Sequence, residues 1–223
     1  MPPASHLFKI MKYTHVIWDF NGTLLSDMEA GIRAINRMLS ARGIATLDTM
    51  EAYREVFGFP IESYYRRIGL DTEREDYKTI LAPEWVGLYN EYSKDAPLCE
   101  GAALLSRALR AAGVRQSILS ASERDMMERQ LQERGALDWF DEIWGSDSIH
   151  AYGKLRIADA WRAAHEDECA VMLGDTTHDY EVAVRMGVDC ILVAAGHHSR
   201  ERLLSCGVPV VNDLYECAKL LGV

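Results

Sequence analysis

The feature that most constrains the fold is a regular alternation of short apolar runs and amphipathic helical segments. Apolar runs of strand length cover residues 16–18, 114–119, 142–144, 169–173, 190–193 and 209–211. Segments with helical spacing of apolar residues alternate with them from residue 101 onward, at residues 101–112, 123–135, 154–164, 179–186 and 213–221. Such alternation is typical of a parallel sheet with right-handed helical crossovers. The sequence therefore predicts an α/β fold with a doubly wound parallel sheet.

The stretch between the first strand and residue 95 follows a different pattern, because nothing in it resembles a strand. Helical spacing covers residues 27–42, 48–57, 61–69 and 73–95. Ser26 and Glu29 form a capping-box pattern, Gly43 is a typical helix end, and Pro83 suits the first turn of a helix. We therefore expect an all-helical cap at residues 27–95, inserted into an α/β core at 11–26 and 96–223, with an N-terminal extension at 1–10.

Composition narrows the classes of partner. The formal net charge of −10 argues against nucleic acid or an anionic membrane surface as the main partner, although a local cation can still hold a phosphate. The five cysteines show no C-x-x-C spacing, which favours a reducing compartment over a disulfide framework. No apolar run has the length of a membrane span and no export signal is visible. We expect a cytoplasmic protein, either monomeric or homodimeric.

Carboxylates stand where two of the predicted strands end. The first strand stops at Asp19 and turns through Asn21, Gly22 and Thr23, and the fourth stops at Asp175. Parallel strands bring these ends to one edge of the sheet, where open α/β sheets bind ligands. A carboxylate placed there can attack phosphorus and become an aspartyl-phosphate. Because two anions repel, such an attack needs a cation, and oxygen ligands favour Mg²⁺.

Further polar residues fall at the same predicted edge. Asp19, Asp175 and the backbone carbonyl of Asn21 are the expected ligands of Mg²⁺. Asp179, four residues after Asp175, is expected to support the metal site. Lys154 is expected to hold phosphate oxygens and to keep Asp19 ionised, and Ser120 to donate a hydrogen bond to the phosphoryl group. The expected substrate contacts are Gly22, Thr23, Ser120, Ala121 and Lys154.

These motifs together resemble the haloacid dehalogenase-like superfamily of phosphohydrolases. The residues that carry the resemblance are D-x-N-G-T at 19–23, a strand ending in Ser120, Lys154, and G-D-T-x-x-D at 174–179. Size and cap placement are most similar to the phosphoglycolate phosphatase and β-phosphoglucomutase group. The resemblance implies a Mg²⁺-dependent phosphohydrolase of a small phosphorylated metabolite, with Asp19 as nucleophile and a helical cap that selects the substrate.

The sequence departs from the family pattern at two places. Leu155 follows Lys154 where the family usually has Pro, so Lys154 is assigned mainly by its order in the chain. Asn21 replaces the aspartate that, in family phosphatases, protonates the leaving group and then activates water. General acid–base catalysis contributes roughly 10²–10⁴-fold, so a phosphatase without it is expected to be slow. His178 or a cap residue is a candidate substitute for the missing acid.

The departure leaves alternatives open. A catalytically weakened phosphate- or metabolite-binding protein on the same fold is the main one, and a phosphomutase is another. Dehalogenation is disfavoured, because a carbon electrophile needs no Mg²⁺. Arg66 and Arg67 on the cap are expected either to meet the far end of a substrate or to be solvated. His197 and His198 are expected to be bystanders, and the aromatic residues 85, 89 and 92 to pack within the cap.

Overall fold

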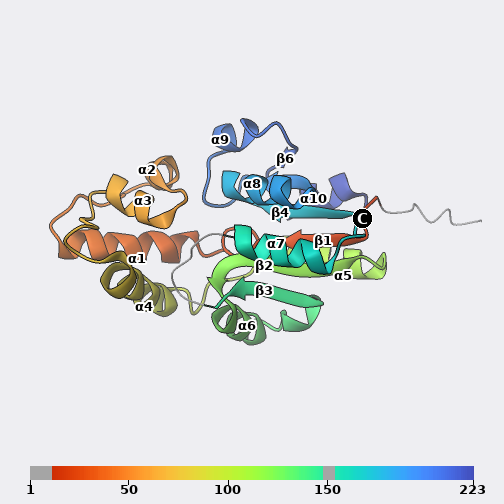
Figure 1. Cartoon of the computed structure of the whole chain (residues 1–223), viewed down its shortest axis with the longest axis horizontal. Coiled ribbons are helices and arrows are strands. Elements are labelled where there is room, and N and C mark those ends of the chain that lie inside the picture. The colour runs from red at the N-terminus through yellow and green to blue at the C-terminus, as the bar shows by residue number, and fades with distance from the viewer. Residues whose placement is uncertain (1–11, 148–153) are drawn as a thin grey trace, which may run out of the picture.

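The computed structural model describes residues 12–147 and 154–223, and the predicted extension at 1–10 lies outside these residues. Their central element is a sheet of six parallel strands in the order β3-β2-β1-β4-β5-β6 (Figure 1). The strands are β1 (His15–Trp18), β2 (Arg115–Glu123), β3 (Glu142–Ser146), β4 (Ala170–Gly174), β5 (Asp189–Val193) and β6 (Val210–Val211). The predicted α/β fold with a parallel sheet is confirmed.

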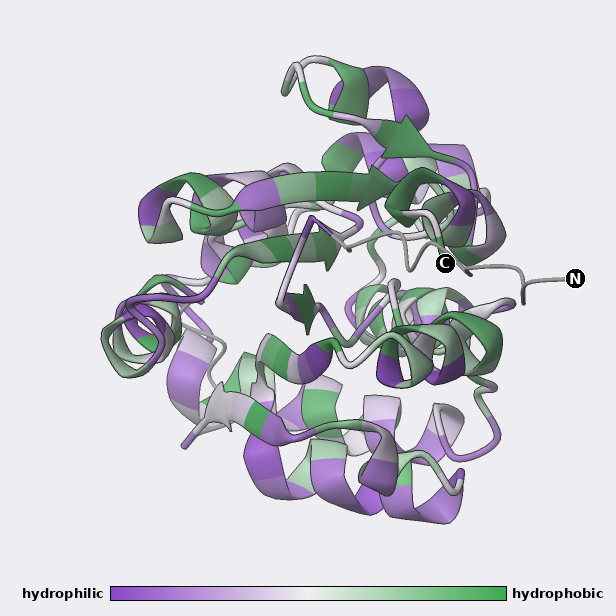
Figure 2. Ribbon diagram, turned by 90° about the vertical axis from the view of Figure 1, so that its right-hand side faces the viewer, coloured by the Kyte–Doolittle hydropathy of each residue, from purple (hydrophilic) through white to green (hydrophobic). Residues whose placement is uncertain are grey.

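Helices cover both faces of the sheet, and successive residues of β1 alternate between them. Val16 and Trp18 pack with apolar residues of α5 (Ala102–Ala111), α6 (Arg124–Glu133) and α10 (Leu214–Leu221). Ile17 packs on the other face with residues of α7 (Leu155–Ala164) and α8 (Thr177–Met186). Figure 2 shows hydrophobic residues concentrated in the central strands, whereas the surrounding helices carry both hydrophobic and hydrophilic residues. Strands buried on both faces read as continuous apolar runs, which is why the sequence revealed them.

A block of helices separates β1 from α5 in the chain and lies to one side of the sheet (Figure 1). It consists of α1 (Met28–Ala41), α2 (Met50–Val56), α3 (Ile61–Arg67), the π-helical turn η1 (Tyr77–Leu81) and α4 (Ala82–Tyr92). The block has its own apolar core, in which Ile35, Met38 and Leu39 of α1 meet several tyrosines. This arrangement is consistent with the predicted cap, whose limits at residues 27 and 95 remain a prediction.

The chain enters and leaves the helical block through two segments that run side by side. The backbone nitrogen of Ser26 donates to the carbonyl of Pro97 (2.9 Å), and that of Cys99 donates to the carbonyl of Leu24 (2.8 Å). Leu25 and Leu98 form an isolated antiparallel bridge between them. Both connections therefore leave the sheet next to the end of β1, which places the block beside the carboxyl edge of the sheet.

Several local predictions were wrong in detail. The capping box at Ser26 and Glu29 does not form, because Asp27 precedes α1 and caps it without a side-chain hydrogen bond. The predicted helix at 73–95 is instead η1 followed by α4, with Pro83 in the first turn of α4 as expected. The strand expected to end near Ser120 continues to Glu123, beyond its last pairing with β1 at Ile118. A short helix, α9 (Arg200–Leu204), was not predicted.

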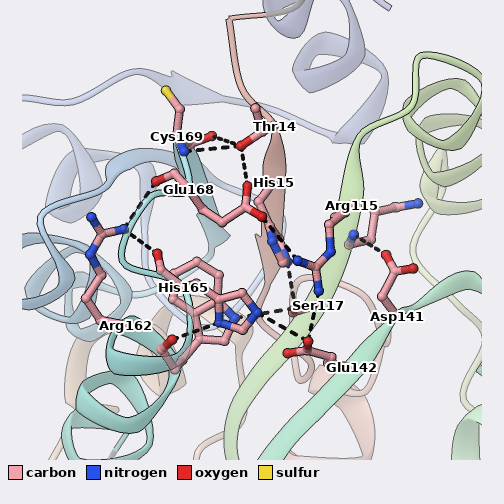
Figure 3. A network of polar contacts seen from close by, with 12 residues as sticks. Thr14, His15, Arg115, Ser117, Asp141, Glu142, Arg162, His165, Glu168 and Cys169 are labelled. Atoms are coloured by element: carbon pink, nitrogen blue, oxygen red, sulfur yellow. Dashed lines mark hydrogen bonds and ion pairs between the residues drawn. The ribbon is translucent and has the colours of Figure 1, made fainter.

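A network of polar side chains joins the strands at the opposite, amino-terminal edge of the sheet (Figure 3). Its buried centre is His15, whose Nε2 lies 2.6 Å from the Oγ of Ser117. Arg115 pairs with Glu142 (3.0 Å) and Glu168 (3.1 Å) around it. Burial lowers the pKa of His15 to about 4, and the nearby Arg115 adds to this effect. The fold therefore holds His15 in its neutral form.

None of the helices within residues 12–147 and 154–223 has the length and apolar character that crossing a bilayer requires.

Candidate active site

Three carboxylates meet at the carboxyl edge of the sheet, at the point where the strand order reverses between β1 and β4. Asp19 follows β1, Asp175 follows β4, and Asp179 lies in the first turn of α8. The pairing of Trp18 with Leu173 brings the ends of the two strands level. One oxygen of each carboxylate lies within 4.8 Å of the others, and all three residues are buried. This is the switch-point position at which ligands bind to open α/β sheets.

Lys154 is the cation of this cluster. It precedes α7, and its Nζ lies 2.6 Å from Oδ1 of Asp19 and also donates to Asp179. The side chain is only 4% exposed, so water does little to screen these contacts. Burial alone would lower the pKa of Lys154, but the carboxylates of Asp179 and Asp19 outweigh it and raise the pKa. Lys154 is therefore charged and fixed against Asp19.

One ammonium group does not balance three carboxylates, and the pKa values reflect this. Burial and the nearby charge of Asp179 raise the pKa of Asp175 to about 7. The same two causes raise the pKa of Asp19 well above its usual value. Burial would also raise the pKa of Asp179, but its ion pair with Lys154 lowers it. A divalent cation held by carboxylate oxygens would relieve this excess negative charge, so the donor set fits Mg²⁺.

Backbone and hydroxyl groups hold the carboxylates in place. The Oδ2 of Asp179 accepts hydrogen bonds from the backbone nitrogens of Asp175 (3.1 Å) and Thr176 (2.9 Å), which completes a capping box at the start of α8. Asp175 accepts from the hydroxyl of Thr23 (2.9 Å) and from the backbone nitrogen of His197 (2.6 Å). Asp179 therefore ties the turn that carries Asp175 to the helix that follows it.

Gly22 and Thr23, expected to contact substrate, lie against Asp175. Gly22 has a φ of +75°, in the left-handed region, and a Cβ at this position would overlap the carboxylate of Asp175. Thr23 is fully buried and uses its hydroxyl on Asp175. The tight turn brings the backbone up to the carboxylate of Asp175, which explains why a glycine stands at position 22 and a hydroxyl residue at position 23.

Asn21 lies in a separate hydrogen-bonded group beside the carboxylates. Its Nδ2 donates to the Oδ2 of Asp27 (2.6 Å) and lies 2.8 Å from the hydroxyl of Tyr89, and its Oδ1 accepts from the Oγ of Ser122 (2.6 Å). Asp27 also accepts from the Tyr89 hydroxyl (2.5 Å) and from the backbone nitrogen of Gly22 (2.9 Å). Asn21 thus joins the sheet edge to α4, and its amide supplies a hydrogen atom to a carboxylate.

A cavity of about 120 Å³ opens between this edge of the sheet and the helical block. Asp19, Ser120 and Lys154 line the end nearest the sheet, with Ala121 beside them. Aromatic and aliphatic residues of the helical block line most of the remainder, namely Tyr53, Phe57, Phe59, Ile61, Tyr64, Tyr65, Tyr77, Ala82, Trp85, Val86 and Tyr89, and the other lining residues are Asn21, Asp27, Gly31, Ser122, Thr176 and His197. Among the described residues, Lys154 is the sole lysine or arginine in the lining. The cavity therefore joins a charged end to a largely aromatic one.

The histidines named from the sequence occupy different positions around the cluster. His197 lines the cavity, and its Nδ1 lies 2.7 Å from the hydroxyl of Tyr53. Burial lowers the pKa of His197, which favours its neutral form. The Nδ1 of His198 accepts from the backbone nitrogen of Thr177 (3.0 Å). His178 contacts Glu181 (2.9 Å) and stacks on Phe59, and it is absent from the cavity lining.

The paired arginines of the helical block do not line the cavity either. Arg66 pairs with Glu62 at the surface and donates to Thr72 (2.7 Å), and Arg67 donates to the carbonyl of Val56 (3.1 Å). In contrast, sequence reasoning missed Asp27 and Tyr53, and it assigned Trp85 and Tyr89 to packing alone. Asp27 was hidden within the expected capping box, and an aromatic side chain in a helix gives no sign of whether it faces a core or a cavity.

Comparison with known proteins identifies the family. The model of haloacid dehalogenase-like hydrolases matches residues 16–193, and the chain belongs to this family. A phosphoglycolate phosphatase of Synechococcus elongatus is 25% identical over 195 residues, which cover 85% of this chain and 88% of the relative.

Solved structures show the same fold. The protein tyrosine kinase A (PtkA) of Mycobacterium tuberculosis aligns with a TM-score of 0.79 at 24% identity, covering 95% of this chain and 99% of the other. A haloacid dehalogenase-like hydrolase of Streptococcus pneumoniae aligns with a TM-score of 0.76 at 22% identity, covering 94% and 98%.

Proposed function

We propose that this haloacid dehalogenase-like hydrolase is a Mg²⁺-dependent phosphatase that forms an aspartyl-phosphate on Asp19. The observation that carries the proposal is the position of Asp19 at the inner end of the cavity, 2.6 Å from Lys154 and within 4.8 Å of two further carboxylates. The relatives named phosphoglycolate phosphatases support the same reaction class.

The nucleophile and its cation define the first step. Lys154 and the backbone nitrogen of Phe20 both contact Oδ1 of Asp19, so we assign the attack on phosphorus to Oδ2. The new bond joins this oxygen to phosphorus, and the bond to the substrate's alcohol oxygen breaks, with the electron pair leaving on that oxygen. Lys154, Ser120 and the amide of Ala121 would hold the phosphoryl oxygens as charge builds on them.

Hydrolysis of the aspartyl-phosphate completes the cycle. Water attacks the phosphorus, the bond to Asp19 breaks, the carboxylate is restored, and the water's proton passes to solvent with release of inorganic phosphate. Mg²⁺, held by Asp19, Asp175 and the carbonyl of Asn21 with support from Asp179, would neutralise the anionic phosphate in both steps. Asn21 can neither donate nor accept the proton, so we expect the first step to depend on how readily the substrate's leaving group departs unprotonated, and the second on solvent to accept the proton of the attacking water.

The test compares phosphate release by the wild type, Asp19→Asn and Asp159→Asn, with and without Mg²⁺. Asp159 is a matched control, because it is a surface carboxylate paired with Arg185. We expect release by the wild type and by the control only with Mg²⁺, and a loss of at least about 10³-fold in Asp19→Asn, as is typical when a nucleophile is removed. Equal activity of Asp19→Asn and the wild type would refute the role of Asp19.

A second candidate is a phosphate- or metabolite-binding protein with vestigial hydrolysis, and Asn21 is the observation that favours it. Under this alternative, the wild type binds a phosphate mimic such as beryllium fluoride in the presence of Mg²⁺ but releases no phosphate from any monoester. Measurable Mg²⁺-dependent turnover that Asp19→Asn abolishes would exclude it.

A further inference from the structure

The cavity next to Asp19 carries information on the substrate that the charged cluster alone does not. Its outer part is formed by stacked and edge-to-face rings. Trp85 and Tyr89 stack with centroids 4.8 Å apart, Tyr53 and Phe57 stack at 5.2 Å, and Tyr65 meets Tyr77 edge-on at 5.7 Å. Cavities of about 150 Å³ with apolar walls hold benzene, and the volume here is about 120 Å³. The whole cavity, its charged end included, is thus of the order of the space that one benzene ring fills, so the group beside the phosphate is no larger than a single six-membered ring.

The charges of the described residues around the cavity disfavour a second anionic group on the substrate. Within the described part of the lining, Lys154 is the sole lysine or arginine, and it is committed to Asp19 and Asp179. His197, which also lines the cavity, already contacts the hydroxyl of Tyr53 through its Nδ1 (2.7 Å). Asp27, which is 2% exposed, adds a carboxylate to the wall. A substrate carboxylate, such as that of phosphoglycolate, would be desolvated beside Asp27 without a cation to pair with.

Asn21 points independently to the leaving group. Without an acid to protonate it, the departing oxygen must carry its negative charge into solvent. A phenol loses its proton near pKa 10, as tyrosine does, whereas bulk water loses one near 15.7, and aliphatic alcohols lie close to water. A phenolate therefore leaves without help far more readily than an alkoxide.

We propose that the substrate is a phosphate monoester of an uncharged phenol, whose ring occupies the cavity between Trp85, Tyr53 and Tyr77 while its phosphate lies against Asp19 and Lys154. This inference rests on the proposed function and names its substrate class. In the first step the phosphorus–aryl oxygen bond breaks, the phenolate takes the electron pair, and it gains its proton from solvent. Asp27 and Tyr89 hold Asn21 in place through their hydrogen bonds with its amide.

Three monoesters separate the contributions of ring and leaving group. Benzyl phosphate and phosphoglycolate both release alkoxides, so a difference between them reports the cavity. Phenyl phosphate and benzyl phosphate both carry a ring, so a difference between them reports the leaving group. With Mg²⁺, we expect kcat/KM for benzyl phosphate to exceed that for phosphoglycolate by at least about tenfold, since a buried unpaired charge is costly. We expect kcat/KM for phenyl phosphate, which reports the step in which the leaving group departs, to exceed that for benzyl phosphate by at least about 10², the lower bound for a missing general acid.

Two substitutions on α4 test the cavity directly. Val86→Arg places a guanidinium in the lining, whereas Gly87→Arg adds the same charge at the neighbouring exposed position, where a Cβ would meet no atom within 4 Å. We expect Val86→Arg to raise KM for phenyl phosphate and to improve kcat/KM for phosphoglycolate, each by at least about tenfold, the effect of one buried charge contact. Gly87→Arg should retain the wild-type preference.

The outcomes separate the inference from the proposed function. If phosphoglycolate is hydrolysed as well as or better than the two ring-bearing esters, and Asp19→Asn abolishes this activity, the protein is a phosphatase and the inference on its substrate is wrong. The inference is also wrong if Val86→Arg and Gly87→Arg behave alike. If none of the three monoesters is hydrolysed and no phosphoryl group appears on Asp19, the proposed function itself fails, and the inference fails with it.

Discussion

Replacing Asn21 by aspartate should destabilise the protein in a strongly pH-dependent manner, although it restores the residue that family phosphatases carry. The reason is Asp27, whose Oδ2 accepts a hydrogen bond from Nδ2 of Asn21 at 2.6 Å and which is buried. In Asn21→Asp this contact becomes one between two carboxylates. At an effective dielectric constant of about 20, two unit charges at that separation repel by about 6 kcal/mol. The pair is therefore expected to bind one proton instead.

The loss of stability in Asn21→Asp can be worked out from the free energy of binding this proton. At pH 8, protonating a carboxyl whose usual pKa is about 3.9 costs about 5.6 kcal/mol, at 1.36 kcal/mol per pH unit. A hydrogen bond between the carboxyl and the carboxylate returns roughly 2 kcal/mol. The variant should thus be about 3 to 4 kcal/mol less stable than the wild type at pH 8. Because the folded-state pKa of the pair is raised above its unfolded value, the penalty grows as pH rises above about 4 and should be close to zero at pH 5.

Urea unfolding followed by tryptophan fluorescence at pH 5 and pH 8 measures this difference. The control is the exchanged pair, Asn21→Asp with Asp27→Asn, which keeps one amide and one carboxylate at the same two positions. We expect the exchanged pair to recover most of the stability at pH 8. A single variant that is as stable as the wild type at pH 8, or an exchanged pair that is as unstable as the single variant, would refute the reasoning.

Three further predictions concern other parts of the molecule. Lys154→Met leaves the three carboxylates without their ammonium group, so it should cost about 3 to 5 kcal/mol of stability in the absence of metal. Added Mg²⁺ should restore part of this lost stability. The control Lys219→Met, in the last turn of α10, should change neither the stability without metal nor the effect of Mg²⁺. An equal loss of stability in both variants would contradict the role of Lys154 as the cation of the carboxylate cluster. Burial lowers the pKa of His15 to about 4. The unfolded chain binds a proton on His15 below a pKa of about 6.5, whereas the folded protein does not bind it until about pH 4. The free energy of unfolding should therefore fall by about 2 to 3 kcal/mol as pH falls from about 6.5 toward 4. His15→Gln should flatten this part of the stability profile, and an unchanged slope would show that another group titrates. Finally, Asn21 cannot activate water, so phenyl phosphate should give a burst of phenol of one equivalent per chain before a slower steady state. Phosphate release measured in parallel should lack the burst, and a burst in both products would contradict slow hydrolysis of the aspartyl-phosphate.

The elements that could be predicted were those whose burial produces a recognisable pattern of apolar residues in the sequence. Val16 and Trp18 face one layer of helices and Ile17 the other, so β1 is apolar throughout and stops visibly at Asp19. The short helix α9 was missed because only Leu203 of its five residues is buried. At the start of α1, Asp27 contacts Asn21 and Tyr89 instead of the helix, and no local pattern reveals a contact made 62 residues away.

Some residues of the candidate site could likewise be predicted from the sequence, and others could not. Asp19, Lys154, Asp175 and Asp179 could be named from the sequence because each follows a strand or opens a helix at the same edge of the sheet, and the structure brings them together. Their chemical roles remain predictions. The walls of the cavity could not be named in advance, because Trp85 and Tyr53 come from helices whose apolar faces also form a core. Only the packing of the helical block against the sheet decides which rings border the space beside Asp19.

The central claim, that Asp19 becomes phosphorylated, is tested most directly by mass spectrometry of the protein after acid quenching. The wild type is mixed with phenyl phosphate and Mg²⁺, quenched within the first turnovers, and mapped by proteolysis. We predict a mass gain of one phosphoryl group on the peptide that contains Asp19, absent without Mg²⁺ and absent in Asp19→Asn. Turnover without any phosphorylated peptide, or a phosphoryl group that persists in Asp19→Asn, would contradict the account.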